Sequence, residues 1–249
     1  MWVLKKLEVM TQFYSNARRD LQNRLVPNPD IKEANHDKVV RRLVLAICIA
    51  LSLPSVPAFA QPKSIPATAT ILVLGDSLSA EYGLKRGTGW VPLLEQRLQQ
   101  RKIKAIVFNA SISGETTSGG KSRLPELLRK HSPTYVLLEL GANDALRGLP
   151  LTSTEANLRF MVQESKKIGA KVLIIGIQIP PNYGKTYTDQ FAAIFSDLAK
   201  SEKTGLVPFL LEGFADKPAA FQADRIHPNE SAQAAMMETV WKEFAGLVR

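Results

Sequence analysis

The segment from Thr70 to Ser79 constrains the fold of this chain most. Residues 70–74 form a short apolar run rich in β-branched residues, which stops at once in Gly75-Asp76-Ser77. This pattern predicts a buried strand that ends in a tight turn. Open α/β sheets bind their ligands at the carboxyl ends of the strands. Ser77 is therefore either a helix N-cap or a nucleophile, and this segment alone does not decide between the two.

Apolar runs alternate with helical patterns along the rest of the chain. Strands are predicted over residues 70–74, 105–109, 135–140, 171–177 and 206–209. Amphipathic helical patterns separate them, one of them over residues 152–168. Continuous apolar strands joined by helices are typical of a parallel sheet that is covered on both faces. We predict a three-layer α/β/α domain with a five-stranded parallel sheet in flavodoxin-like order.

The charge of the chain is spread unevenly. The 249 residues carry a formal charge of +9, and residues 1–60 contain nine of the 32 basic side chains but only five of the 23 acidic ones. The remainder is mildly basic and has no long run of Lys or Arg. Nucleic-acid binding requires clustered basic side chains, so no nucleic-acid partner is expected. We expect a monomer that acts on small molecules.

Residues 1–60 have the features of an export leader. Arg41-Arg42 precede an apolar stretch over 43–53, and Ala58-Phe59-Ala60 forms a cleavage site of the A-x-A type. We predict a signal peptide that is cleaved after Ala60, a linker over 61–69 and a catalytic domain over 70–249. The apolar stretch is too short for a comfortable membrane span, although an uncleaved anchor is the alternative. The protein is expected in the periplasm or outside the cell, without a stable membrane span after cleavage.

Two details of the leader bear on this prediction. About forty mostly polar residues precede the apolar stretch, which is longer than a usual amino-terminal region of a signal peptide. Either the true start lies near Val39 or Val40, or the leader is unusual. Cys48, the one cysteine of the chain, lies within the apolar stretch. Cleavage would therefore leave a chain without cysteine, which excludes disulfides, a catalytic thiolate and cysteine-bound metal.

Polar residues that could carry chemistry follow several of the predicted strands. The carboxyl ends of parallel strands share one edge of the sheet, so Ser77, Asn143 and His227 are expected to lie near one another. Asp224 stands three residues before His227, close enough to bind Nδ1–H and leave Nε2 free for a serine hydroxyl. His131 instead closes an apolar helical stripe, which indicates a structural residue at a helix end.

Other polar residues near these loops have simpler interpretations. Asn143 is a residue type that is common in turns and helix caps, but its amide can also donate to an oxyanion. Gly114 is either a turn glycine or a place where a backbone N–H approaches a substrate. Asp76 is expected to shape its own turn. Glu139 is a charge in an apolar strand and needs a partner, for which Arg123 and Arg147 are the candidates.

Taken together, these pieces resemble the motifs of the SGNH (GDSL-type) hydrolases. They occur in order along the chain, as Ser77 in Gly-Asp-Ser-Leu-Ser, Gly114 in Asn-Ala-Ser-Ile-Ser-Gly-Glu-Thr, Asn143 in Gly-Ala-Asn-Asp, and His227 in Asp-Arg-Ile-His-Pro-Asn. The resemblance covers residues 71–247. It is closest to the bacterial periplasmic thioesterase I, arylesterase and lysophospholipase branch, to which Leu140–Gly148 and Pro180–Gly184 are similar.

The resemblance implies a serine esterase that needs neither a metal nor a cofactor. Its substrates would be small acyl esters, thioesters or lysophospholipids. Ser77 would be the nucleophile, His227 the base and Asp224 the residue that orients the base. The oxyanion would be held by the backbone N–H groups of Ser77 and Gly114 and by the amide of Asn143.

Apolar residues in the loops after the third and fourth strands are the candidates for binding the acyl chain. These are Leu146, Leu149, Ile179 and Tyr183. The chain departs from the family pattern at Ala142 and Glu81, where glycine is frequent. Both departures concern the shape of the pocket, and therefore the range of substrates rather than the chemistry.

Two other functions are compatible with the same motifs. A carbohydrate-ester deacetylase would use the same groups on acetylated sugars. A non-catalytic envelope-binding module would keep the fold without the reaction. Nucleotide binding is less well supported, because no G-x-G-x-x-G motif follows the first strand.

Overall fold

The computed structural model describes residues 68–248, and the predicted signal peptide with its cleavage site after Ala60 lies outside them. The described part contains a five-stranded parallel sheet in the order β2-β1-β3-β4-β5. Its strands are β1 (Ala69–Gly75), β2 (Ala105–Asn109), β3 (Tyr135–Glu139), β4 (Lys171–Ile175) and β5 (Gly205–Val207). The predicted fold class and the flavodoxin-like strand order are confirmed.

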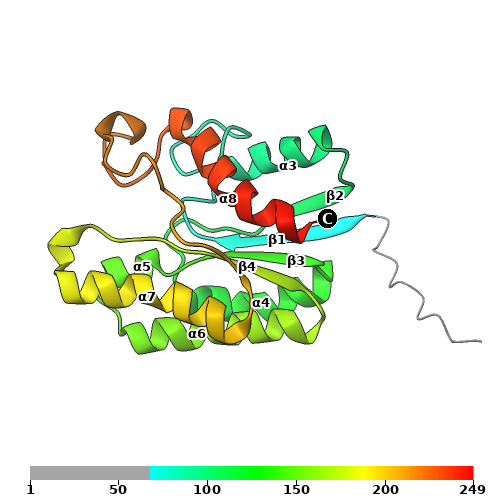
Figure 1. Cartoon of the computed structure of the whole chain (residues 1–249), viewed down its shortest axis with the longest axis horizontal. Coiled ribbons are helices and arrows are strands. Elements are labelled where there is room, and N and C mark those ends of the chain that lie inside the picture. Colours follow the sequence, from blue (N-terminus) through cyan, green and yellow to red (C-terminus); the bar gives the residue numbers. More distant parts are fainter. Residues whose placement is uncertain (1–67, 249) are drawn as a thin grey trace, which may run out of the picture. The chain divides into compact units, whose positions relative to one another are not determined.

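Helices cover both faces of this sheet, as Figure 1 shows. One face carries α3 (Trp90–Gln100) and α8 (Gln233–Leu247). The other carries α4 (Thr117–His131), α5 (Ala142–Leu146), α6 (Leu151–Lys167) and α7 (Lys185–Glu202). Three short 3₁₀ turns, η1 (Pro181–Tyr183), η2 (Pro218–Ala220) and η3 (Glu230–Ala232), lie in the connecting loops.

The core lies on both sides of the central strands. Ile71 to Leu74 of β1 and Val136 to Leu138 of β3 are buried, with neighbours from the helices of both layers. Trp90 of α3, Phe244 of α8 and Phe191 and Phe195 of α7 are the largest fully buried side chains. This double-sided burial explains why the strands read as continuous apolar runs rather than as an alternating pattern.

Three strands end earlier than the sequence predicts, and one helix is missing from the prediction. β3 stops at Glu139, β4 at Ile175 and β5 at Val207. After β3 the chain turns at Gly141, whose φ is +122°, directly into α5. A five-residue helix has too short a pattern to be recognised, so Asn143 was expected in a loop. β1 begins at Ala69, which the prediction gave to the linker.

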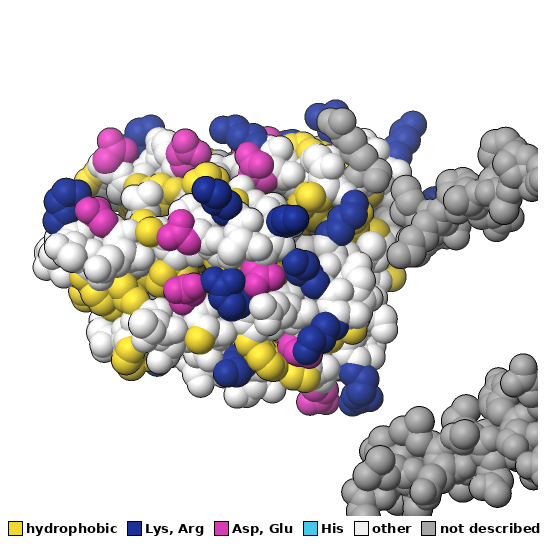
Figure 2. Space-filling model, turned by 60° about the horizontal axis from the view of Figure 1, so that its bottom comes forward, with side chains coloured by type: hydrophobic (Ala, Val, Ile, Leu, Met, Phe, Trp, Pro, Cys, Tyr) yellow, Lys and Arg dark blue, Asp and Glu magenta, His cyan; other side chains and the backbone are white. Residues whose placement is uncertain are grey.

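The surface of the described part carries charges of both signs. On the face that Figure 2 shows, Lys and Arg side chains are interspersed with Asp and Glu. Within residues 68–248, no helix is long and apolar enough to cross a bilayer.

Candidate active site

Ser77 lies in a tight turn directly after β1. The carbonyl oxygen of Asp76 accepts hydrogen bonds from the N–H groups of Ser79 (3.3 Å) and Ala80 (3.0 Å). The Asp76 side chain supports the same turn, because its Oδ1 accepts from the N–H of Leu78 at 3.0 Å. The expectation that Asp76 shapes this turn is therefore confirmed. The turn leaves Ser77 half-buried at the carboxyl end of a central strand.

A hydrogen-bonded chain connects Ser77 to His227 and Asp224. The Nε2 atom of His227 lies 2.9 Å from Ser77 Oγ, although 150 positions separate the two residues. Nδ1 of His227 lies 2.7 Å from Asp224 Oδ2. A carboxylate only accepts, so Nδ1 carries the proton in this arrangement and Nε2 is left to accept from the serine hydroxyl. The structure thus brings the three residues together in the geometry expected from the sequence.

Asp224 also fixes the loop that carries His227. Its Oδ1 accepts from the N–H of Ile226 at 2.9 Å and from that of His227 at 3.0 Å. These bonds, with the backbone N–H of His227 first among them, lower the pKa of Asp224 to about 2. The carboxylate is therefore ionised at any pH near neutrality.

Tyr82 is a neighbour of His227 that sequence reasoning missed. Its ring lies 4.4 Å from the imidazole ring, centroid to centroid, with an interplanar angle of 40°. It comes from the loop after the Ser77 turn, and the side chain of Gln222 donates to its carbonyl oxygen at 2.8 Å. No pattern in the sequence marks it, because a single aromatic residue in a loop has no periodic signal. His131, by contrast, ends α4 and packs on Phe108.

Two backbone N–H groups near Ser77 have no acceptor among residues 68–248. They belong to Ser77 itself and to Gly114 in the β2–α4 loop. Gly114 has a φ of +78°, a conformation that favours glycine. Its carbonyl oxygen accepts from Nη2 of Arg147 at 2.9 Å, which holds the loop against the chain after α5. Both N–H groups are free to donate to a bound ligand.

Asn143 lies in α5 and links this helix to two loops. Its Nδ2 donates to Asp76 Oδ2 and to the carbonyl oxygen of Glu115, both at 3.0 Å. Asp76 precedes the nucleophile candidate, and Glu115 follows Gly114. The amide is therefore held between the turn after β1 and the loop after β2, and both of its hydrogens have an acceptor in the free protein.

The next residue, Asp144, fastens α5 to the start of α4. Its Oδ2 accepts from the N–H of Thr117 at 2.8 Å and its Oδ1 from the Thr117 hydroxyl at 2.5 Å. Both residues are buried. No pattern in the sequence marks Asp144, because its partner lies 27 positions away.

The partner predicted for Glu139 is wrong. Arg123 pairs with Glu115, and Arg147 donates to Gly114. Glu139 is fully buried, and its Oε2 instead accepts from the hydroxyl of Ser79 at 2.7 Å. The side chain lies against the turn after β1, so donors of that turn satisfy it in place of an arginine.

Burial perturbs both acids beneath the turn. Desolvation raises the pKa of Asp76 to about 6, against the opposing effect of its hydrogen bonds and of His227. Desolvation, and then the neighbouring charge of Asp76, raise the pKa of Glu139 well above its ordinary value. Each carboxyl group affects the pKa of the other, so the two titrate as a pair.

Two of the four residues expected to line an acyl site, Leu146 and Tyr183, are in direct contact. The hydroxyl of Tyr183 donates to the carbonyl oxygen of Leu146 at 3.4 Å, which joins the loops after β3 and β4. Leu149 and Tyr183 are exposed, Leu146 is half-buried, and Ile179 is 8% exposed. Exposed apolar side chains on these loops offer surface to an apolar ligand.

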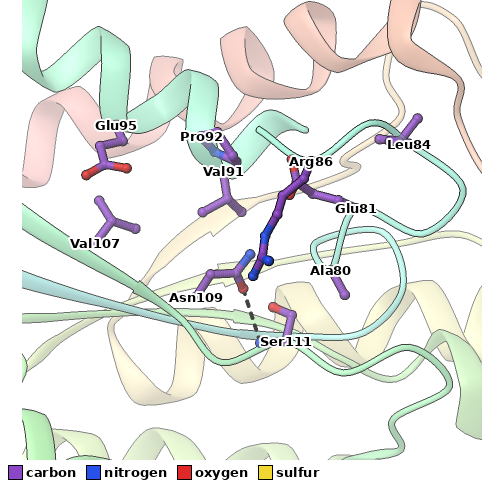
Figure 3. A pocket seen from close by; sticks show the side chains of 10 residues that line it. All are labelled: Ala80, Glu81, Leu84, Arg86, Val91, Pro92, Glu95, Val107, Asn109 and Ser111. Atoms are coloured by element: carbon purple, nitrogen blue, oxygen red, sulfur yellow. Dashed lines mark hydrogen bonds between the residues drawn. The ribbon is translucent and has the colours of Figure 1, made fainter. Parts of the chain in front are cut away.

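A polar cavity of about 530 Å³ lies on the other side of the Ser77 turn, between α3 and β2. Figure 3 shows Arg86 extending toward Asn109 and Ser111, with Glu81 close by. Glu81 adopts a φ of +58°, and its Oε1 accepts from the N–H groups of Gly87 and Gly89, both at 2.8 Å. The glutamate that replaces the expected glycine therefore fixes the loop over residues 81–89.

Comparison with known proteins identifies the family. Residues 73–235 match the GDSL-like Lipase/Acylhydrolase family, and the chain belongs to this family of ester hydrolases. It is 46% identical to Esterase TesA of Pseudomonas aeruginosa over 209 residues, which cover 84% of this chain and all of that protein. It is 44% identical to the Thioesterase 1/protease 1/lysophospholipase L1 of Escherichia coli K12, over 72% of this chain and 85% of that protein.

Solved structures agree with these relatives. The crystal structure of TesA matches 72% of this chain and 99% of that one, with a TM-score of 0.70 and 47% identity. The psychrotrophic esterase EstA from Pseudoalteromonas sp., in a form inhibited by monoethylphosphonate, matches 72% of this chain and 98% of that one, with a TM-score of 0.69 and 39% identity. The fold and the family membership are thus shown by sequence and by structure.

The buried acid pair predicts how stability changes with pH. A carboxyl group whose pKa is higher in the folded state stabilises the fold below its unfolded pKa of about 3.8, and this contribution is lost as pH rises through about 6. Asp76→Asn removes this titration. The free energy of unfolding should therefore fall less between pH 4.5 and pH 7.5 in the variant than in the wild type, as measured by urea denaturation. An equal fall in both proteins would contradict the raised pKa.

Proposed function

We propose that this protein is a serine esterase that hydrolyses acyl esters and thioesters with Ser77 as its nucleophile. The observation that supports this most is the hydrogen-bonded chain from Asp224 through His227 to Ser77 Oγ. A serine hydroxyl is a weak nucleophile until a base takes its proton, and the base must itself be oriented. The chain has these parts at hydrogen-bonding distance, and all three residues lie within the region that matches the family.

In the proposed mechanism, Ser77 Oγ attacks the acyl carbonyl carbon while its proton passes to His227 Nε2. The tetrahedral intermediate collapses as the bond to the leaving oxygen or sulfur breaks, and His227 gives its proton to that atom. Water then attacks the acyl-Ser77 ester and gives a proton to His227, which returns it to Ser77 Oγ as the carboxylic acid leaves. Asp224 orients the imidazole and stabilises its charged form in both steps. These steps need no metal or cofactor.

The oxyanion of each tetrahedral intermediate would receive three hydrogen bonds. The N–H groups of Ser77 and Gly114 have no acceptor among the described residues and are free to donate. Asn143 supplies the third donor. Because both hydrogens of Nδ2 already have acceptors, the hydrogen that bonds to Asp76 would be shared with the oxyanion. Asp76 is the closer of the two acceptors to Ser77 in the chain, which favours this choice.

The substrates we propose are small molecules with an apolar acyl group. Relatives that cover most of this chain are named as esterase, arylesterase and thioesterase or lysophospholipase. Apolar side chains on the loops after β3 and β4 would contact the acyl chain, namely Leu146, Leu149, Ile179 and Tyr183. The polar cavity beside Glu81 and Arg86 lies on the opposite side of the Ser77 turn and would suit a polar leaving group.

A carbohydrate-ester deacetylase is the alternative within the same chemistry. An acetyl-xylooligosaccharide esterase from Geobacillus is structurally similar, with a TM-score of 0.61, but at 22% identity this likeness concerns the fold alone. The exposed apolar loop residues favour longer acyl groups over acetylated sugars. We also propose export to the periplasm or outside the cell, with cleavage after Ala60, which rests on the leader sequence.

Replacement of the proposed nucleophile tests the function directly. Ser77→Ala should abolish labelling by a fluorophosphonate probe and lower kcat on an aryl ester by at least about 1000-fold, because no other group can form the acyl intermediate. Labelling is followed by intact-protein mass. Ser122→Ala, which removes an exposed serine hydroxyl on α4, is the control and should label as the wild type does.

The outcomes separate the candidate functions. Hydrolysis by Ser77→Ala at the wild-type rate would exclude Ser77 as the nucleophile. A wild-type protein that is folded but takes up no label would favour a non-catalytic binding module.

A larger side chain at the proposed acyl site should change the preferred substrate. Ile179→Trp should move the optimum toward shorter acyl chains, because the indole occupies space that a long chain would use. The measurement is kcat/KM over a series of p-nitrophenyl esters and acyl-CoA thioesters. Ile168→Trp, at a position 50% exposed at the end of α6, is the matched control and should leave the profile unchanged. An unchanged profile in Ile179→Trp would exclude this residue from the acyl site.

A further inference from the structure

Glu139 is a buried acid for which the proposed mechanism has no role. It ends β3, is 1% exposed and has no cationic partner among residues 68–248. Burying a carboxyl group without a cation is costly unless hydrogen bonds satisfy it. Its Oε2 accepts from the Ser79 hydroxyl at 2.7 Å and from the N–H of Asp76 at 3.2 Å. Both donors belong to the turn that presents Ser77.

The carboxyl group of Glu139 lies close against Gly75 of β1. A Cβ atom at Gly75, which pairs with Glu139 across the two strands, would come within 2.7 Å of Glu139 Oε2 and 2.8 Å of Ser79 Oγ. Only glycine fits at this position. The close contact of strand backbone, hydroxyl and carboxyl group makes one rigid unit of the end of β1 and the end of β3.

Asp76 connects this unit to the candidate oxyanion donor. Its N–H donates to Glu139, while its Oδ2 accepts from Asn143 Nδ2 at 3.0 Å. Asp76 is itself 1% exposed, so no bulk solvent replaces either contact. A continuous path of short hydrogen bonds thus runs from Ser79 through Glu139 and Asp76 to Asn143.

The charge of the pair supports a positioning role. Burial and the charge of Asp76 raise the pKa of Glu139 well above its ordinary value, whereas that of Asp76 rises only to about 6. The raised pKa of Glu139 favours its protonated form, which can donate a hydrogen bond to the Asp76 carboxyl group. Asp76 then remains an acceptor, as the bond from Asn143 requires.

We propose that Glu139 is a positioning residue that acts through Asp76 to hold the Asn143 amide where the oxyanion forms. It touches neither the substrate nor the reacting atoms. The inference rests on the proposed function, since it assigns Asn143 to the oxyanion. Small displacements of a donor reduce the rate strongly, because its stabilisation of the transition state depends on orientation.

Replacement of Glu139 by residues that keep or lose its hydrogen bonds tests the proposal. Glu139→Leu should lower kcat on p-nitrophenyl butyrate by about 10- to 100-fold and change KM by less than about threefold, because only the transition state uses the donor. Glu139→Gln keeps an acceptor for Ser79 and a donor for Asp76, and it should restore kcat to within about threefold of the wild type. Rates are divided by the fraction of active sites titrated with a phosphonate.

Two further variants distinguish the positioning of Asn143 by Glu139 from a general loss of protein stability. Ser165→Ala removes a buried hydroxyl that donates to Met161 within α6, away from the site, and should lower stability without changing kcat. Where Glu139→Leu does not fold, Glu139→Asp serves instead, because it keeps a carboxyl group but withdraws it by one methylene. It should lower kcat about tenfold at unchanged KM.

A double-mutant cycle tests whether Glu139 affects kcat through Asn143. Asn143→Ala alone should lower kcat by about 100- to 1000-fold. In that background, Glu139→Leu, or Glu139→Asp in its place, should lower kcat by less than about threefold further, since the donor that it positions is already absent.

The results distinguish this inference from the proposed function. Full activity of a folded Asn143→Ala variant would exclude Asn143 from the oxyanion site. It would contradict both the oxyanion site of the proposed function and the positioning role of Glu139. A low kcat in Asn143→Ala together with an unchanged kcat in the Glu139 variants, or with a full additional loss in the double variant, would overturn only the positioning role.

Discussion

The parallel pairing of β1 with β3 is the constraint on which the rest of the site depends. Its register sets Gly75 opposite Glu139 at the last paired position. Both strands end there, so Asp76-Ser77 after β1 and the segment from Leu140 to Asn143 after β3 leave the sheet side by side. This is the point where the strand order reverses, since β1 is followed by β2 on one side and by β3 on the other. A shift of the register by one residue would separate the Ser77 turn from Asn143 and would turn Glu139 away from it.

The site combines two carboxylate environments with opposite properties. Asp224 is partly exposed and receives two backbone N–H groups, so its pKa falls and it stays charged beside His227. Asp76 and Glu139 are buried together, so their pKa values rise and their neutral forms are favoured. The first arrangement supports a transient positive charge on the imidazole. The second limits the negative charge close to the place where an oxyanion would form, while it still offers an acceptor to Asn143.

The sequence predicted the fold and the strand order, because apolar runs and glycine turns are local signals. It predicted the meeting of Ser77 with His227, 150 positions apart, from the shared edge of parallel strands and from the resemblance to the family. The short spacing of Asp224 and His227 indicated their pairing. The sequence did not predict α5, which is too short for a periodic pattern. It also missed the contacts that join distant residues, such as Tyr82 on His227 and Asp144 on Thr117. The partner of Glu139 was wrong for the same reason. Charge complementarity suggested an arginine, whereas the strand register places the carboxyl group under the Ser77 turn.

A crystal structure of the enzyme inactivated by a short alkyl p-nitrophenyl phosphonate tests the central claim most directly, because the adduct mimics the tetrahedral intermediate. The account predicts phosphorus bonded to Ser77 Oγ, with one phosphoryl oxygen about 3 Å from the backbone nitrogens of Ser77 and Gly114 and from Asn143 Nδ2. It also predicts that Asn143 keeps its contact with Asp76. An adduct on another residue, or a phosphoryl oxygen directed away from these three donors, would contradict it.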